Sequence, residues 1–434
     1  MSNVSKTFCP IPWIFQAARN NGDLRVCCQA NISKNRGLIK DANGNPYNAR
    51  DGKLQEARNA PLIREMRVDM MEGRWPEECT RCEQEEKSGL NSRRLYELNT
   101  WPYQFQDLKA KTAQDGSIDV TEIPVVYYDL RFGNKCNLAC RMCGPSDSDS
   151  WYEDYFSMTN RNFYFDSHGK VEIEKRGSRW VDTKASYNWH ESSQFWKELE
   201  ENSHNIQHIY MAGGEPLLIE KHYDFLEKCI EQKISANIIL EYNTNLTLLP
   251  QRVVDLWQNF KQVRVGASID GYGETLEFQR YPAKWDKIYS NLKKLDNLEA
   301  PVISWLAYTV TIYNLMHLPE FMRWKVLESG FQRINSTKKR PIITHHMAHK
   351  PEHLNIRVLS EEQKKKVSES FANYKDIYHQ SFNDLQAKAA MAILDSVEKY
   401  MWNKSYHDEF YEESMNFSLK LDSIRGQNSQ KFLP

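Results

Sequence analysis

Between residues 125 and 347 the sequence alternates short apolar runs with stretches of helical pattern, and this alternation limits the folds open to the chain. A period of strand, helix and strand predicts parallel strands wrapped by helices. We therefore expect an α/β fold built on a full or partial barrel. The apolar runs are 125–132, 206–213, 236–242, 262–270, 302–314 and 341–347, and the candidate helices between them include 195–202, 222–234, 250–260, 285–295 and 318–330.

Three parts of the chain lie outside this repeat. Residues 1–124 contain a loop rich in Asn, Gly and Asp and a helical stretch, and we expect a separate N-terminal unit there. The core barrel is expected over 125–355, with an aromatic-rich insertion at 146–190 that either covers the site or is disordered. Residues 356–434 are compatible with helix, which predicts a helical C-terminal extension.

Charge and hydropathy exclude some classes of protein. The chain carries 57 Lys and Arg against 58 Asp and Glu, so no electrostatic footprint for a nucleic-acid partner is present. No segment reaches the roughly 18 successive apolar residues of a membrane span, and the first residues lack the apolar run of a signal peptide. We expect a cytoplasmic protein without membrane association.

The cysteines are clustered. In a chain without a secretory signal, clustered cysteines favour metal or iron-sulfur ligation over disulfides. The ninth cysteine, Cys229, shares a helical face with Phe225, Leu226 and Ile230, which predicts a core position. The other eight are Cys9, Cys27, Cys28, Cys79, Cys82, Cys136, Cys140 and Cys143.

The last three cysteines form the run CNLACRMC directly after the first predicted strand. A closed zinc site requires four ligands, whereas a cubane cluster held by three thiolates leaves one iron open for a substrate or cofactor. The loop at the carboxyl end of a barrel strand is where such folds place their chemistry. A zinc site with a distant fourth ligand and three ordinary thiols remain the alternatives.

The second predicted strand ends in Gly213, Gly214, Glu215 and Pro216. Two glycines let the backbone approach a ligand closely, and exposed backbone groups with a carboxylate can receive an ammonium group. Alone, such a tetrapeptide is often only a turn. Its position beside the cysteine loop gives it weight.

These two motifs, each after a strand, resemble the radical S-adenosylmethionine (radical SAM) superfamily over about residues 125–350. The resemblance implies a partial (β/α)6-type barrel in which Cys136, Cys140 and Cys143 ligate a 4Fe-4S cluster. The amino and carboxylate groups of S-adenosylmethionine would bind the open iron. Reduction would then give a 5'-deoxyadenosyl radical that abstracts hydrogen from a substrate, with flavodoxin or ferredoxin as the reductant.

The resemblance also implies contacts to S-adenosylmethionine. Gly213, Gly214 and Glu215 would receive its amino group, and Arg280 would bind its carboxylate, although a surface arginine is the alternative. Met142 replaces the usual aromatic residue before the third cysteine and can cover an adenine face. Polar residues at strand ends are candidates as well, with turn formation as their alternative role; they are Asn243, Asn245, Ser268 and Asp270.

The N-terminal cysteines resemble the auxiliary-cluster modules called twitch or SPASM, although such modules usually follow the barrel. Cys9, Cys79, Cys82 and one of Cys27 and Cys28 would ligate an auxiliary 4Fe-4S cluster. Neighbouring residues of an extended segment point to opposite faces, so only one of the doublet is expected to ligate. Structural zinc is the alternative.

The substrate is predicted only as a class. Enzymes with such modules modify ribosomal peptides, sulfatase side chains or amino sugars, so a peptide or protein is the leading hypothesis and a carbohydrate or other small molecule the alternative. A non-catalytic zinc-binding interaction protein is the competing hypothesis. The histidines at 345, 346, 349 and 353 predict a loop at the barrel mouth with substrate contact or proton exchange, more than a metal site.

Overall fold

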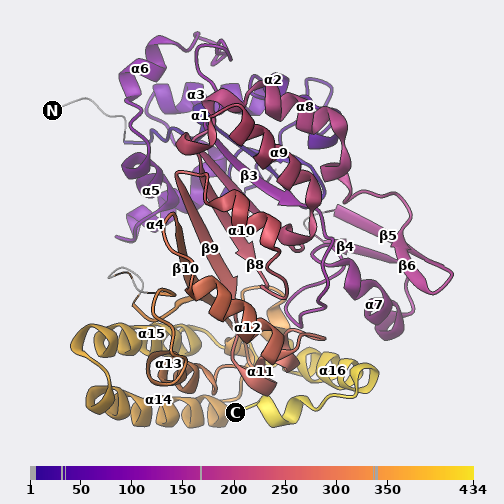
Figure 1. Ribbon diagram of the computed structural model, residues 1–434, viewed down its shortest axis with the longest axis vertical. Coiled ribbons are helices and arrows are strands. Elements are labelled where there is room, and N and C mark those ends of the chain that lie inside the picture. The colour runs from indigo at the N-terminus through magenta and orange to yellow at the C-terminus, as the bar shows by residue number, and fades with distance from the viewer. Residues whose placement is uncertain (1–5, 31–32, 35, 167–168, 336, 338–340) are drawn as a thin grey trace.

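The computed structural model describes residues 6–30, 33–34, 36–166, 169–335, 337 and 341–434. A curved, open sheet of eight strands in the order β11-β10-β9-β8-β7-β3-β1-β2 forms its centre (Figure 1). Neighbouring strands are parallel except β1 and β2. The strands are β1 (Phe15–Ala18), β2 (Leu24–Arg25), β3 (Tyr127–Phe132), β7 (His208–Gly213), β8 (Ile239–Thr244), β9 (Gln262–Ser268), β10 (Val302–Val310) and β11 (Thr344–Met347).

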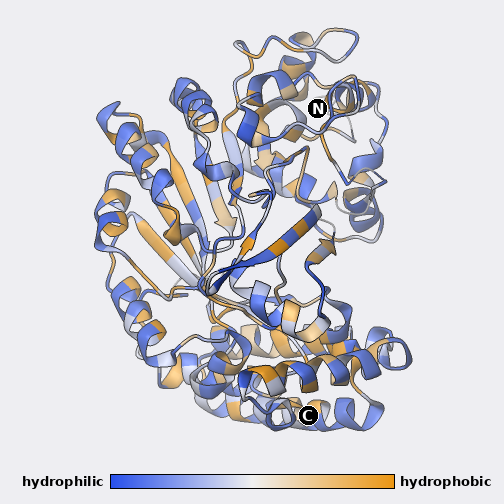
Figure 2. Cartoon of the chain, turned by 90° about the vertical axis from the view of Figure 1, so that its right-hand side faces the viewer, coloured by the Kyte–Doolittle hydropathy of each residue, from blue (hydrophilic) through white to orange (hydrophobic). Residues whose placement is uncertain are grey.

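The predicted α/β class and all six predicted strands are confirmed, since β3 and β7 to β11 lie within or beside the expected runs. The sheet is a partial barrel, because its end strands β11 and β2 do not pair with each other in the described part of the chain. Hydrophobic strands face helices whose outer surfaces are hydrophilic (Figure 2). These helices are α8 (Ser193–Glu201), α9 (Glu220–Glu231), α10 (Gln251–Trp257), α11 (Gly273–Gln279), α12 (Trp285–Asp296) and α13 (Leu318–Leu327). Cys229 is buried on α9, as predicted.

The N-terminal segment extends the same sheet. Strand β1 pairs with β3 in parallel from Phe15 beside Tyr127 to Ala18 beside Leu130. A single hydrophobic core continues from Phe8 to Met401. Residue 124 therefore marks no break in the sheet or the core, and an auxiliary module over 1–124 stays a prediction. The helices of this segment are α1 (Ile11–Ile14), α2 (Leu54–Ala57), α3 (Pro61–Met71), α4 (Thr80–Lys87), α5 (Arg93–Thr100) and α6 (Phe105–Ala110).

The insertion after the cysteine loop forms a small unit at the right of Figure 1. Helix α7 (Tyr152–Thr159) precedes an antiparallel sheet of β4 (Phe163–Asp166), β5 (Gly169–Arg176) and β6 (Arg179–Asp182). This sheet has its own apolar cluster, which includes Tyr152 and Ile173. Since β5 is central, β4 and β6 each have one edge that pairs with no other described strand.

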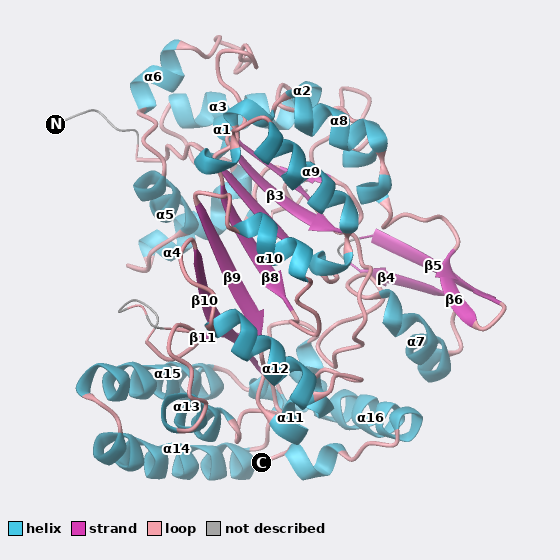
Figure 3. Cartoon of the chain, in the orientation of Figure 1, coloured by secondary structure: helices cyan, strands magenta, loops and turns pink. Residues whose placement is uncertain are grey.

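The C-terminal extension is helical, as predicted, and lies across the lower part of the molecule (Figure 3). It consists of α14 (Glu361–Ser381), α15 (Asp384–Asn403) and α16 (His407–Arg425). Ser360 and Asn383 form capping boxes that begin α14 and α15. No described helix is long and apolar enough to cross a membrane.

Candidate functional site

Three thiols of one loop line a single cavity at the carboxyl ends of the parallel strands. Cys136, Cys140 and Cys143 follow β3 and face this cavity of about 450 Å³, which we call the cysteine cavity. The side chain of Asn245 places its Nδ2 3.8 Å from the Cys136 Sγ, and Arg280 places its Nη1 3.9 Å from the Cys140 Sγ. Both donors favour a negative charge on the sulfur that they contact.

The three thiols differ in their electrostatic surroundings. Burial raises the pKa of Cys136 to about 12. The pKa of Cys140 is lowered, first by the hydrogen bond from the Cys143 thiol and further by the Arg280 guanidinium. That same hydrogen bond and burial raise the pKa of Cys143. Of the three, Cys140 gives up its proton most readily.

The glycines that end β7 hold the cysteine loop. Gly214 N donates to Gly133 O at 3.0 Å, and Glu215 N donates to Lys135 O at 2.8 Å. A Cβ atom on Gly214 would lie 2.3 Å from Lys135 O, and Gly213 has a φ of 120° that favours glycine. The glycines are therefore required for packing against the backbone that leads into the cysteine loop, and they also line the cysteine cavity.

The carboxylate of Glu215 accepts hydrogen bonds from the turn after β8. Its Oε1 accepts hydrogen bonds from Thr244 Oγ1 at 2.7 Å and Leu217 N at 3.0 Å, and its Oε2 accepts one from Asn245 N at 2.6 Å. Burial raises the pKa of this carboxyl group to about 7. Glu215 does not line the cysteine cavity, so a contact to an ammonium group there falls to the backbone of the glycines.

Asp270 does not line the cysteine cavity, but it pairs with Arg280, which does. Its carboxylate is fully buried, pairs with Arg280 Nη2 at 2.6 Å and accepts a hydrogen bond from Thr309 N at 2.7 Å. The guanidinium expected to bind a cofactor carboxylate is thus already held by an acid. The sequence-predicted residues that do line the cavity beside the cysteines and glycines are Met142, Asn243, Asn245, Ser268 and Arg280.

Helix α16 packs against the back of the cysteine loop. Arg141, inside the cysteine motif, is fully buried and pairs through Nη2 with Asp422 of α16, and Gln427 accepts a further hydrogen bond at 2.9 Å. Its guanidinium lies 3.8 Å from the ring centre of Phe278. One turn on, Arg425 pairs with Asp154 of α7 at 2.7 Å. The C-terminal extension is therefore part of the site's framework.

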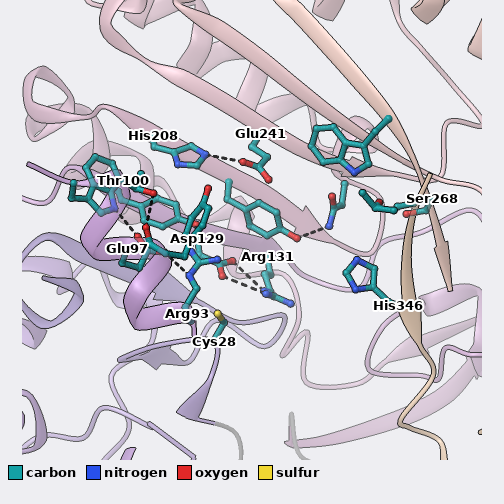
Figure 4. A pocket seen from close by; sticks show the side chains of 18 of the residues that line it. Cys28, Arg93, Glu97, Thr100, Asp129, Arg131, His208, Glu241, Ser268 and His346 are labelled. Atoms are coloured by element: carbon teal, nitrogen blue, oxygen red, sulfur yellow. Dashed lines mark hydrogen bonds and ion pairs between the residues drawn. The ribbon is translucent and has the colours of Figure 1, made fainter. Parts of the chain in front are cut away.

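A second cavity of about 410 Å³ adjoins the first, and we call it the charged cavity (Figure 4). Ion pairs line its wall: Arg93 with Glu97, Arg131 with Asp129 at 3.1 Å, and His208 with Glu241 at 3.2 Å. Aromatic rings line it as well, among them Tyr96, Trp101, Tyr127, Tyr210 and Trp305. The residues common to both cavities are Arg131, Tyr210, Asn243, Ser268 and Thr309, so the two cavities form one hollow.

The N-terminal cysteines have different surroundings. Cys79 and Cys82 act electrostatically on Cys9, whose pKa is raised mainly by burial, and Cys9 in turn acts on Cys27. Cys28 instead lines the charged cavity. Cys9 thus interacts electrostatically with Cys27, Cys79 and Cys82, and Cys28 lines the hollow.

The histidines after β10 lie in different environments. His346 lines the charged cavity, His349 lies 3.0 Å from the Tyr400 hydroxyl, and His353 pairs with Glu413 of α16 at 3.2 Å. In the residues that the structure describes, no group of three or more His, Cys, Asp and Glu side chains could hold one metal ion.

Sequence reasoning missed several residues of the hollow. Asp129 and Arg131 interrupt an otherwise apolar strand, a signal that could have found them. Arg19 follows β1, a strand too short for a periodicity, and Asp422 is 281 residues from its partner Arg141. No sequence pattern relates those two residues to the site.

Residues 130–324 match the family model described as the Radical SAM superfamily. The matched segment contains the cysteine motif, the Gly-Gly-Glu-Pro turn and Arg280. This match supports a radical SAM superfamily enzyme. No curated protein matches the chain.

Solved structures resemble the chain distantly. Native anSMEcpe with bound AdoMet has 17% sequence identity and a TM-score of 0.35, with 60% of this chain and 62% of that chain covered. SuiB from Streptococcus suis bound to S-adenosylmethionine has 13% identity and a TM-score of 0.35, with 88% of this chain and 71% of that chain covered. The chain thus spans somewhat less than two thirds of the first of these structures.

The cysteine cavity fits a cubane cluster. Each thiolate of such a cluster binds a different iron, so its ligands face a common space and do not converge on one ion. Cys136, Cys140 and Cys143 line such a space, and donors from Asn245 and Arg280 contact two of the sulfurs. The set of ligands and the room beside it therefore suit a 4Fe-4S cluster with S-adenosylmethionine.

Proposed function

We propose that the chain is a radical SAM enzyme that acts on a peptide or protein side chain. The observation that carries the proposal is the common cavity of the three thiols and the glycines that end β7. Cys136, Cys140 and Cys143 would hold a 4Fe-4S cluster there, and such a cluster, once reduced, would supply the electron for cleavage of S-adenosylmethionine to a 5'-deoxyadenosyl radical.

The chain's own residues have distinct tasks in this proposal. The backbone of Gly213 and Gly214 receives the amino group of S-adenosylmethionine, and Asn243 and Ser268 stand between the cofactor and the charged cavity. The charged cavity holds the substrate group that loses hydrogen. Its polar wall orients this group through hydrogen bonds, while Trp305 and the other rings exclude water.

An extended peptide is favoured over a carbohydrate by strand β4. Its outer edge pairs with no strand in the described part of the chain, the Phe163 carbonyl there accepts a hydrogen bond from the Tyr155 hydroxyl at 2.8 Å, and Phe163 and Phe165 are 45% and 74% exposed. An open edge can bind an extended peptide as an added strand. Asp166 at the end of β4 accepts a hydrogen bond from Ser146, just beyond the cysteine loop, so a peptide on this edge runs toward the cysteine cavity.

The second part of the proposal is an auxiliary 4Fe-4S cluster on Cys9, Cys27, Cys79 and Cys82. Its support is the clustering of these cysteines in the sequence and the electrostatic effect that Cys79 and Cys82 have on Cys9, and Cys9 on Cys27. Because all these thiols must stay reduced, we further propose a cytoplasmic location with flavodoxin or ferredoxin as the reductant.

The deciding experiment is anaerobic. The protein is reconstituted with iron and sulfide and incubated with S-adenosylmethionine and dithionite, and 5'-deoxyadenosine is measured. We expect product from the wild type and a loss of at least about a hundredfold when Cys136, Cys140 and Cys143 are all changed to Ala, because no ligand of that cluster remains. Cys229→Ala is the matched control, since this thiol is buried on α9. A colourless protein that binds zinc and refuses iron would contradict the proposal.

A further inference from the structure

Strand β1 brings an arginine to the hollow. The register of β1 on β3 pairs Ala17 with Asp129 and Ala18 with Leu130, so Arg19 comes next to Arg131 at the carboxyl edge of the sheet. Both arginines line the cysteine cavity, and Arg131 also lines the charged cavity. The junction of the two cavities is therefore flanked by two guanidinium groups.

The other arginines of the hollow have acidic partners. Arg93 pairs with Glu97, Arg131 with Asp129 and Arg280 with Asp270. Arg19 forms no ion pair and no side-chain hydrogen bond with any residue in the described ranges, and its Nε is buried without a partner.

The nearest acids are already engaged. Asp129 is bound by Arg131, and Asp147 accepts a hydrogen bond from Asn20 Nδ2 at 3.2 Å while it forms no ion pair with Arg19. Burial and the positive charge of Arg131 lower the pKa of Arg19 to about 10. Both effects disfavour the charge that the side chain still carries at neutral pH.

Such an arrangement is costly without a ligand. Arg19 is half-buried with its Nε enclosed and without a partner, and two like charges side by side on neighbouring strands repel each other. An anion between Arg19 and Arg131 would remove both costs. A carboxylate suits a guanidinium best, because its two oxygens match the two donors in geometry.

We propose that Arg19, assisted by Arg131, binds a carboxylate of the substrate at the junction of the two cavities. The inference rests on the proposed function and narrows its substrate to one that carries a carboxylate, such as an acidic side chain or the C-terminal group of a peptide. The carboxylate anchors the substrate beside the cysteine cavity, and the rest of the bound residue lies against the aromatic wall of the charged cavity.

The test compares two probes on the full chain, N-acetyl-L-tyrosine and its neutral isostere N-acetyl-L-tyrosinamide. We expect the acid to bind the wild type about tenfold more tightly than the amide, as one charge-assisted contact allows. In Arg19→Gln this ratio falls to about one while the affinity for the amide is unchanged. Arg252→Gln, an exposed arginine of α10, is the matched control and keeps the wild-type ratio.

Thermal stability is a second readout. A ligand-binding role and a structural role of Arg19 predict changes of opposite sign in the midpoint of unfolding. Because Arg19 has no side-chain partner among the described residues, Arg19→Gln should raise the midpoint of thermal unfolding, by about 2 °C. A residue that only supports the fold would lower the midpoint when replaced. A lowered midpoint together with an unchanged probe ratio would overturn the proposal.

S-adenosylmethionine also carries a carboxylate, so a third measurement tests whether Arg19 binds the carboxylate of the substrate or that of the cofactor. With reconstituted protein, Arg19→Gln should bind S-adenosylmethionine within about twofold of the wild type. A selective loss of affinity for S-adenosylmethionine, with its decarboxylated analogue unaffected, would assign Arg19 to the cofactor and overturn the proposal. Probe binding that depends on Arg19 in a protein that makes no 5'-deoxyadenosine would support the carboxylate site and contradict only the radical chemistry.

Discussion

At the scale of single residues, the doublet Cys27 and Cys28 shows how the backbone assigns different roles to identical side chains. Strand β2 ends at Arg25 and Cys28 lies in a turn, so the doublet does not alternate as an extended strand does. The thiols of Cys27 and Cys28 interact with each other, and of the two only Cys28 lines the charged cavity beside Arg93. The two thiols should respond differently to replacement.

We predict that Cys27→Ala loses the iron of one cluster, about half of the total, because a ligand of the auxiliary cluster is removed. Cys28→Ala should keep the full iron content, since Cys28 lines the charged cavity and Cys27 does not. Iron and sulfide analysis after anaerobic reconstitution measures both. Equal loss in the two variants, or no loss in either, would contradict the assignment of Cys27.

At the scale of elements, α16 holds the cysteine loop in place. Its Asp422 pairs with the buried Arg141 and accepts a hydrogen bond from Ser429 N at 2.6 Å. Trp151, which follows the loop, donates to Cys140 O at 2.8 Å and packs with Leu421 of α16. The loop therefore keeps its shape through contacts with distant elements.

We predict that Asp422→Asn destabilises the protein by about 3 kcal/mol, because Arg141 is left as a buried charge without a counterion. Hydrogen exchange of residues 136–150 should become faster in the iron-free protein, and iron uptake should fall. Lys420→Ala, an exposed position on the same helix, is the control and should change stability by less than about 0.5 kcal/mol. An unchanged exchange rate in Asp422→Asn would show that α16 does not hold the loop.

At the scale of the whole molecule, buried histidines link stability to pH. His222 is enclosed between β3, β8 and α9, where its Nδ1–H donates to Ile219 O and its Nε2 has no partner. Burial lowers its pKa to about 3. In the unfolded chain a histidine binds its proton near pH 6.5, so between these values only the unfolded state is protonated and stability falls as the pH falls.

We predict that the free energy of unfolding drops by about 2 kcal/mol more in the wild type than in His222→Gln between about pH 6.5 and pH 5, at about 1.4 kcal/mol per pH unit. Urea unfolding at the two pH values measures the difference. His204→Gln, at an exposed position, should follow the wild type. An equal drop in the wild type and His222→Gln would mean that the ring takes up its proton in the folded state.

The sequence could predict the strands that surround the hollow but not how it is closed. The runs that became β3 and β7 to β11 are apolar and regularly spaced, so their pattern is visible without a structure. The run of β1 has four residues, and its partner β3 lies more than 100 residues away in sequence, so only the pairing itself reveals the strand. Arg19 was missed for this reason.

In the candidate site, too, local motifs were predictable from the sequence and long-range contacts were not. The cysteine motif and the glycines were predicted because each is a local pattern with one chemical meaning. The position of the Glu215 carboxylate was not predictable, because its hydrogen bonds to Thr244 and Asn245 depend on how two turns meet in space. A local motif therefore identifies which residues form the site, while long-range packing decides where each polar atom points.

The ion pair between Arg141 and Asp422 also sets an order of events during synthesis. Arg141 emerges from the ribosome 281 residues before its partner, and the strands β7 to β11 are made in between. Until α16 has been synthesised, the buried guanidinium in the middle of the cysteine motif lacks its counterion, and the loop cannot settle. We therefore expect the loop to accept a cluster only after residue 422 has been synthesised, 281 residues after Arg141.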